Sequence, residues 1–275
     1  MHFVSGSTGN KALHNTLKNN DIMSRNDADH GDNDSGAWGV LLNASGNEVA
    51  HNSFSGNIAC SEDYGIEGAS VEIYHAGNNL IRHNSSVNDS TFSELGGQSE
   101  GNTFAFNLFA PLNETSQKAA EFLIVPGNKG TRVYNNTAYK VQVGLACFRT
   151  CDTSVLDFRN NIVVGASNAR KSEFYSDAVP LESHNVFGRI DAFPQYFSGG
   201  SSPPASTLLL SAGQTNTLFV SSSESNFRLG ASSAAVDAGN PELTFLAELG
   251  ISTDLDNRPV PYGRAPDAGA YERQY

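Results

Sequence analysis

The sequence predicts an all-β fold, a single-stranded right-handed parallel β-helix that ends in an irregular C-terminal closing segment. Two observations predict it: a short apolar pattern around Asn recurs along most of the chain, and the apolar runs are too short for helices. Equivalent Asn residues lie 23 to 37 residues apart, as expected for solenoid repeats. Each repeat would supply short strands that pair with those of the next coil.

The pattern reads apolar-x-x-Asn-x-apolar and is clearest in GNKALHNTLKNN (9–20), GNEVAHNSFSGN (46–57) and GNNLIRHNSSVN (77–88). The equivalent asparagines are Asn15, Asn52, Asn84, Asn107, Asn136, Asn161 and Asn185. Coils of a parallel β-helix stack about 4.8 Å apart. We therefore expect an amide ladder inside a corner, where the Asn side chains satisfy buried backbone groups. Val49 and Phe54 would then fill the interior.

A second strand precedes the Gly-Asn corner in several repeats. These runs are WGVLLNA (38–44), VEIYHA (71–76), EFLIVP (121–126) and VGLACF (143–148). When the first two of these runs are aligned, Val40 and Val71 point inward, and Glu72 and Tyr74 point outward. Glu94 of the following coil can be aligned beside Glu72.

The repeats divide the chain into three segments. Residues 1–198 form the predicted coils, 199–206 (GGSSPPAS) resemble a linker, and 207–275 form a C-terminal coil and closing segment packed on the helix. The chain enters its first repeat within about ten residues, so we expect either that the sequence is a fragment or that the capping element before the first coil is absent.

The composition limits the classes of partner that the protein can bind. A formal net charge of -12 makes nucleic acid a poor partner, because the chain repels phosphates. The sequence contains no apolar run long enough for a membrane span, and its start lacks the features of a secretory signal. Cys147 and Cys151 could form a small disulfide loop or remain buried thiols, and Cys60 is left over.

Acidic residues interrupt the repeats. The long intervals contain SRNDADHGDNDSG (24–36) and ACSEDYGIEGAS (59–70), which we expect at the same corner of neighbouring coils. Carboxylates on irregular loops suit a hard cation such as Ca²⁺, although a solvated acidic surface explains them equally. The candidate metal ligands are Asp63, Glu67, Glu72, Asp89 and Glu94. Glu72 and Glu94 are alternatively an acid/base pair.

Three histidines occupy equivalent positions just before the ladder Asn. His14, His51 and His83 would form a column with about 5 Å between neighbours. Such a column could bind a transition metal. We favour a scaffold role, because Phe106 and Asn135 replace the histidine in later coils.

The coils, together with 215–242 and the closing run TDLDNRPVPYGRAPDAGAYE (253–272), resemble bacterial right-handed parallel β-helix repeat proteins of the pectate lyase superfamily. The resemblance implies an extracellular or periplasmic protein that handles an acidic, uronate-containing polysaccharide. In calcium-dependent lyases of this group a Lys or Arg abstracts the C5 proton; the candidates are Arg82 and Lys118. One branch carries its base in a Phe-Lys-Leu-Gly-Gly segment, whereas FSELGG (92–97) has Ser93 where the Lys would fall.

The sequence predicts the first of three functions, with the other two as alternatives. The first is a Ca²⁺-assisted polysaccharide lyase that works by β-elimination. The second is an inverting glycoside hydrolase that uses the pair Glu72 and Glu94. The third is a non-catalytic polysaccharide-binding or surface module.

Overall fold

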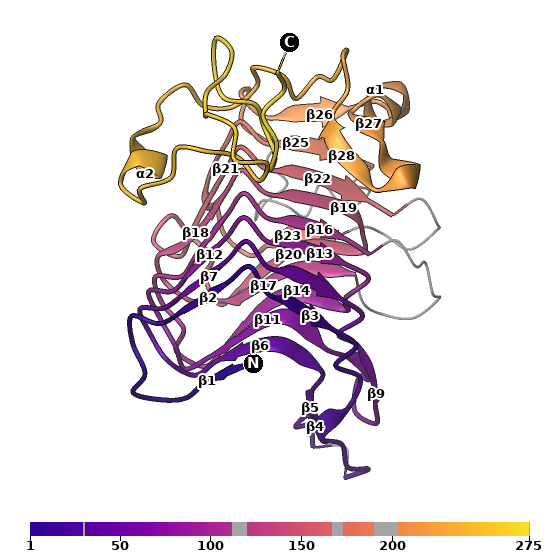
Figure 1. The fold of residues 1–275 in the computed structure, drawn as a ribbon, viewed down its shortest axis with the longest axis vertical. Coiled ribbons are helices and arrows are strands. Elements are labelled where there is room, and N and C mark those ends of the chain that lie inside the picture. Colours follow the sequence, from indigo (N-terminus) through magenta and orange to yellow (C-terminus); the bar gives the residue numbers. More distant parts are fainter. Residues whose placement is uncertain (30, 112–119, 167–172, 190–202, 275) are drawn as a thin grey trace.

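The computed structural model is a parallel β-helix, described over residues 1–29, 31–111, 120–166, 173–189 and 203–274 (Figure 1). Three parallel sheets run along it, here called sheets A, B and C, and most coils contribute one strand to each. Strands pair in parallel with those of the preceding and following coils. The fold class predicted from the repeats is confirmed.

The strands are short, and their bounds follow the repeats. Sheet A contains β1 (His2–Phe3), β6 (Trp38–Leu42), β11 (Ala69–Tyr74), β14 (Thr91–Gly96), β17 (Glu121–Pro126), β20 (Val143–Phe148) and β23 (Glu173–Ser176). Sheet B contains β2 (Lys11–Leu13), β7 (Glu48–Ala50), β12 (Leu80–Arg82), β15 (Thr103–Ala105), β18 (Thr131–Tyr134), β21 (Leu156–Arg159) and β24 (Leu181–Ser183). Sheet C contains β3 (Thr16–Lys18), β8 (Ser53–Ser55), β13 (Ser85–Val87), β16 (Leu108–Ala110), β19 (Thr137–Val141), β22 (Ile162–Gly165), β25 (Val186–Gly188) and β26 (Leu208–Leu210).

The predicted amide ladder lies at the corner between sheets B and C. Asn52 is typical: its backbone N–H and its Nδ2 both donate to Asn84 Oδ1, at 2.9 and 3.0 Å. Its Nδ2 also donates to the Ala12 carbonyl at 2.9 Å. The residue before each ladder Asn is left-handed, with φ of 57° at His51 and 52° at His83. The ladder is therefore the means by which each tight corner satisfies its buried backbone groups.

Two more ladders mark the other corners. Before sheet B, the Asn47 N–H donates to Asn79 Oδ1 at 2.9 Å, and Asn79 repeats the contact with Asn102 at 3.0 Å. After sheet C, the Asn57 N–H donates to Asp89 Oδ1 at 2.8 Å. All three corners of the coil are thus fastened by side chains of neighbouring coils.

The interior is apolar and rich in phenylalanine. Val49 and Phe54 are buried as predicted, with exposures of 0% and 1%. Phe92 stacks on Phe122 with ring centroids 5.4 Å apart, and it also contacts Phe109. These rings supply the buried apolar surface that stabilises the stack.

The two acidic segments, 24–36 and 59–70, are insertions at the same corner of neighbouring coils, the corner between sheets C and A. The repeat intervals predict this placement. The first carries β4 (Met23–Arg25) and β5 (Ser35–Gly36), and the second carries β9 (Ala59–Ser61) and β10 (Gly65–Glu67). Each is a small antiparallel pair. The insertions therefore lie where strands β6 and β11 of sheet A begin.

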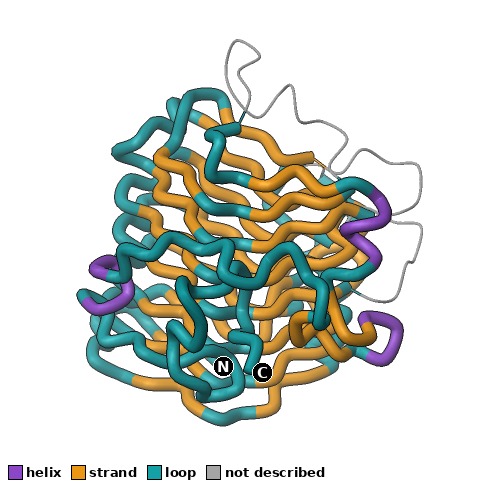
Figure 2. The backbone as a smooth tube through the Cα atoms, turned by 90° about the horizontal axis from the view of Figure 1, so that it is seen from above, coloured by secondary structure: helices purple, strands orange, loops and turns teal. Residues whose placement is uncertain are grey.

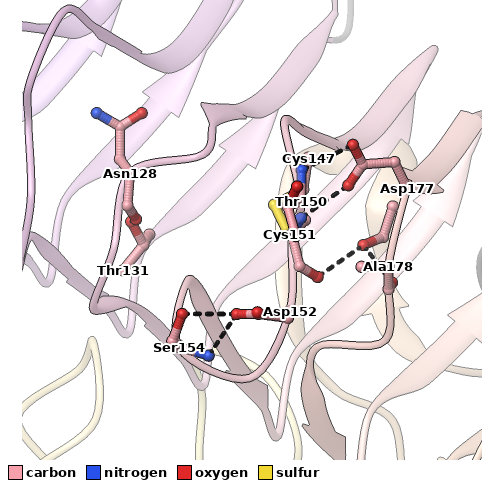
Figure 3. The surroundings of a disulfide bond; sticks show 10 residues. Asn128, Thr131, Cys147, Thr150, Cys151, Asp152, Ser154, Asp177 and Ala178 are labelled. Carbon is pink, nitrogen blue, oxygen red and sulfur yellow. Dashed lines mark hydrogen bonds between the residues drawn. A yellow bond between two sulfur atoms is a disulfide. The ribbon is translucent and has the colours of Figure 1, made fainter.

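Cys147 and Cys151 form a disulfide, which decides between the two alternatives that the sequence leaves open (Figure 3). Both residues are fully buried. The Asp177 carboxylate accepts the N–H groups of Thr150 and Cys151, at 2.9 and 2.7 Å (Figure 3). Cys60 is free and exposed.

The C-terminal segment (residues 211–274) contains α1 (Ala212–Asn216), β27 (Phe219–Ser221), a 3₁₀ turn (Ser222–Glu224), β28 (Asn226–Leu229) and α2 (Thr244–Ala247) (Figures 1 and 2). It lies on the corner between sheets B and C. Asn135 donates to the Asp267 carbonyl at 3.1 Å, and the Ala270 N–H donates to Thr137 Oγ1 at 2.9 Å. Among the described residues, no helix is long and apolar enough to cross a membrane.

Candidate functional site

Glu72 and Glu94 form a carboxylate pair on the outer face of sheet A. They are register partners on the neighbouring strands β11 and β14, so the alignment predicted from the repeats is confirmed. The row continues as Leu41 on one side and Ile124 on the other. Farther along the row lie His2, Ala146 and Tyr175, so in the described strands of sheet A acidic residues occupy it only at Glu72 and Glu94.

The pair holds a proton more tightly than free carboxyls do. Burial raises the pKa of Glu72 well above its ordinary value, and the charges of Glu94 and Glu67 raise it further. Burial also raises the pKa of Glu94, although its side chain reaches solvent at its surface. Because Glu72 is the less exposed of the two, it is the better proton carrier.

Glu67, at the end of β10, is the third carboxylate of this group. Burial raises its pKa to about 7, and the charges of Glu94, Asp34 and Asp63 act in the same direction. Its Oε2 is buried and has no hydrogen-bond partner among the described residues. Glu67, Glu72 and Glu94 thus form one electrostatically linked acidic group beside β11 and β14 of sheet A.

An aromatic ring lies beside the pair. Tyr74 is 49% exposed and is the register partner of Gly96. A Cβ added at Gly96 would lie 2.6 Å from the Tyr74 ring, and one at Gly97 would lie 2.6 Å from the His75 ring. The Gly-Gly sequence therefore leaves the space in which both rings lie over β14, next to Glu94.

Asp63 organises the two inserted loops. Its Oδ2 accepts the N–H groups of Asn33 and Asp34, at 2.8 and 3.1 Å. Asp34 in turn accepts the Asp63 N–H at 3.0 Å and the Ser61 hydroxyl at 2.9 Å. The second oxygen of Asp63 is buried without a partner in the described chain.

Asp89, another predicted metal ligand, lies inside the solenoid. It is 2% exposed and belongs to the ladder after sheet C. Its Oδ2 accepts the hydroxyls of Ser70 and Ser86, at 2.6 and 2.9 Å. The structure therefore separates Asp89 from the acidic group on the outer face.

Of the two predicted bases, Arg82 lies on another sheet from the carboxylate pair. Arg82 lies on sheet B, where its Nε donates to Glu48 Oε1 at 2.8 Å. Its guanidinium also contacts His83 Nδ1 at 3.1 Å and His51 Nε2 at 3.4 Å. Lys118 lies outside the described residues.

No group of three His, Cys, Asp or Glu side chains is placed to hold a metal ion within the described ranges. Asp63 and Glu67 offer one unpartnered oxygen each. Asp27 Oδ1 and Asn33 Oδ1 of the first inserted loop are likewise buried without a partner among the described residues. Ca²⁺ takes six to eight oxygen ligands, so these four atoms do not make a complete calcium site by themselves.

The histidine column is present with the predicted spacing. Ring centroids are 5.0 Å apart for His14 and His51 and 4.9 Å apart for His51 and His83, and His83 stacks on Phe106 at 5.4 Å. The column forms one wall of a groove of about 430 Å³, and Leu255 and Tyr271 of the C-terminal segment also line it. The scaffold interpretation missed this groove, because the segment that completes it is remote in sequence.

The comparisons with known proteins concern the fold. No protein-family model matches the sequence, and no curated protein matches it. The crystal structure of pectate lyase Pel9A is similar at 16% identity and a TM-score of 0.46, over 86% of this chain and 68% of that one. A pectate lyase bound to a hexasaccharide is similar at 12% identity and a TM-score of 0.41, over 84% and 63% of the two chains. The parallel β-helix itself rests on the strand register described above.

Proposed function

We propose that the protein is a carbohydrate-active enzyme, a glycoside hydrolase that uses Glu72 and Glu94 as its two catalytic carboxyl groups. The observation that carries the proposal is their register pairing on β11 and β14, combined with raised pKa values in both groups. Glycoside hydrolysis needs one protonated and one ionised carboxyl group on the two sides of the scissile bond. Two neighbouring carboxylates that resist simultaneous ionisation supply that combination.

In this mechanism Glu72 acts as the general acid. It gives its proton to the glycosidic oxygen as the C1–O bond breaks, while Glu94 removes a proton from the water whose oxygen bonds to C1. Adjacent strands hold Cα atoms about 4.8 Å apart. Inverting enzymes have carboxyl groups about 6.5–9.5 Å apart, so the predicted inversion requires the two side chains to diverge.

The surroundings favour an uncharged sugar at the cleavage point. Glu67, Glu72 and Glu94 are all acidic. Burial raises the pKa of Glu72, and the charges of Glu94 and Glu67 raise it further, with no cation among the causes. A uronate would be repelled unless a cation accompanied it. The exposed Tyr74 ring offers an amphipathic surface on which a sugar ring can stack.

Calcium-assisted elimination is the second candidate, favoured by the unpartnered oxygens of Asp63 and Glu67. A bound calcium ion would neutralise a uronate carboxylate and make the C5 proton more acidic. Because the described residues do not gather a full ligand set, we derive no step through that ion.

An extracellular or periplasmic location is part of the proposal. The buried disulfide between Cys147 and Cys151 supports it, because disulfides persist in oxidising compartments.

The test is turnover of neutral and uronate polysaccharides by the wild type and by Glu72→Gln and Glu94→Gln. Hydrolysis predicts new reducing ends from a neutral glycan, no unsaturated product, and a loss of at least about 100-fold in each variant. Proton NMR of the first product gives the anomer and hence inversion or retention. Unsaturated uronates that form only with Ca²⁺ and disappear with a chelator would establish the lyase instead. Absence of both products would leave the non-catalytic module.

A further inference from the structure

We propose that the groove beside the histidine column is a second carbohydrate site, which binds a neutral oligosaccharide along the solenoid axis. The groove lies at the corner between sheets B and C, away from the acidic group on sheet A. Its volume of about 430 Å³ is within the range of small-ligand sites, and polar groups converge in it. The inference extends the carbohydrate activity proposed above to a face without catalytic carboxylates.

A row of free hydroxyl groups forms the floor of the groove. Thr16, Ser53 and Ser85 are register partners on β3, β8 and β13. None of these hydroxyls has a hydrogen-bond partner in the described part of the chain, and all three residues line the groove. The row repeats at the strand spacing of about 4.8 Å, so it presents the same donor and acceptor to each successive unit of an extended ligand.

Hydrogen bonds within the protein fix the orientation of the imidazole rings of His83 and His51 before any ligand binds. His83 Nε2 donates to the Thr253 carbonyl at 2.8 Å, which leaves its Nδ1 to accept from Arg82 at 3.1 Å. The same guanidinium nitrogen faces His51 Nε2 at 3.4 Å. His14, at the outer end of the stack, has no polar side-chain partner among the described residues.

The other residues of the left-handed column are Phe106, Asn135, Asn160 and His184, so histidine recurs once outside the groove. Where the C-terminal segment covers the column, the position is Phe106, Asn135 or Asn160, each held by that segment. His14 and His51 have the same backbone conformation, with φ of 57° at both, but no such cover. Packing against the C-terminal segment explains the residues at the covered positions. The side chains of His14 and His51 are not covered by that segment and are accessible to a ligand.

The chemistry of the lining selects the ligand class. No Asp, Glu, Lys or Arg is among the residues that line the groove, in a chain of net charge -12. Hydroxyls and imidazoles match the hydroxyl groups of a sugar, and Leu255 and Tyr271 offer an apolar wall for its C–H faces. The Arg82 guanidinium beside His51 and His83 is paired with Glu48, so an uncharged, hydroxyl-rich chain fits the groove better than a phosphate, a uronate or a metal ion.

The test is calorimetric titration of the full chain with cellohexaose, xylohexaose and mannohexaose, with hexagalacturonate and Ni²⁺ as comparison ligands. Ser53→Trp fills the groove from its floor and should weaken binding of the neutral sugar at least tenfold. Ser55→Trp lies on the same strand but outside the groove, and should change binding less than twofold. His51→Asn keeps a residue that the column already accepts at Asn135, and should weaken binding severalfold.

Binding that Ser53→Trp leaves unchanged would overturn the proposal, as would binding of only hexagalacturonate or only Ni²⁺. The titrations are run in the Glu72→Gln, Glu94→Gln double variant, so that turnover cannot consume the ligand. Loss of binding in Ser53→Trp without loss of hydrolysis identifies the groove independently of the catalytic pair. Conversely, hydrolysis can fail while sugar binding in the groove is retained.

Discussion

At the corner between sheets B and C and on the outer face of sheet A, equivalent side chains of neighbouring coils lie one strand spacing apart. At the corner they are asparagines, which satisfy one another through hydrogen bonds of 2.9 to 3.1 Å. On sheet A they are Glu72 and Glu94: burial raises the pKa of both, and the charge of Glu94 raises that of Glu72 further. The same stacking geometry therefore has opposite energetic consequences.

The difference follows from donor and acceptor capacity. An amide has both, so a column of identical Asn side chains is complete except at its ends. An ionised carboxylate only accepts, so a column of carboxylates gains nothing from itself and repels. A stacked acidic pair is thus a cost that the fold does not require, and this supports a functional reason for it.

The largest expected effect comes from breaking the amide column at its centre. Asn107 accepts from Asn84 and donates to Asn136 and to the Ile81 carbonyl. Asn107→Ala leaves these buried groups unpaired and should lower the free energy of unfolding by about 3 kcal/mol, measured by urea denaturation.

The matched control is Asn15→Ala at the open end of the same column. Within the described part of the chain the Asn15 side chain donates only to Asn52 and Leu13, so its loss should cost about 1 kcal/mol. Equal losses at Asn107 and Asn15 would contradict the comparison.

The second effect concerns the acidic group and is a dependence on pH. The pKa of Glu67 is about 7 in the folded protein against 4.5 ordinarily, so protonation favours the folded state. Its contribution to stability is complete below about pH 4.5 and is lost as the pH rises through about 7. Between about pH 5 and pH 8.5, Glu67→Gln should therefore gain on the order of 1 kcal/mol relative to the wild type.

Urea denaturation at a series of pH values measures this difference. Glu62→Gln, in the exposed part of the same loop, is the control and should run parallel to the wild type. A Glu67→Gln curve that is also parallel would show that Glu67 is not strained by burial.

The smallest effect tests the aromatic ring beside the pair. Gly96→Ala places a Cβ 2.6 Å from the present position of the Tyr74 ring, which must then move. We expect kcat/KM to fall about fivefold on the substrate found by the turnover test, or about 1 kcal/mol. Gly213→Ala has open space around its Cβ and should leave kcat/KM unchanged. A Gly96→Ala enzyme with full activity would remove Tyr74 from substrate binding.

Much of the architecture could be predicted because it repeats. Asn52 and its equivalents return at each coil, and alternation along each strand then assigns Val40 inward and Glu72 outward. The pairing of Glu72 with Glu94 and the 5 Å histidine column follow from the same period, and both are confirmed.

Non-repeating contacts could not be predicted in this way. Nothing local indicates that Asp89 turns inward to Ser70 and Ser86, or that Arg82 pairs with Glu48 on another sheet from the acidic group. These outcomes depend on which face of which sheet each coil presents, and a periodic pattern does not resolve them.

The sequence by itself determined the coils, the amide ladder and the carboxylate pair, because short-range periodicity sets strand register and side-chain direction. Only the tertiary structure decided that Cys147 pairs with Cys151, and that Leu255 and Tyr271 meet the histidine column. The C-terminal segment has no repeat of its own. Its position is set by long-range packing and by hydrogen bonds such as that from His83 to Thr253, 170 residues apart.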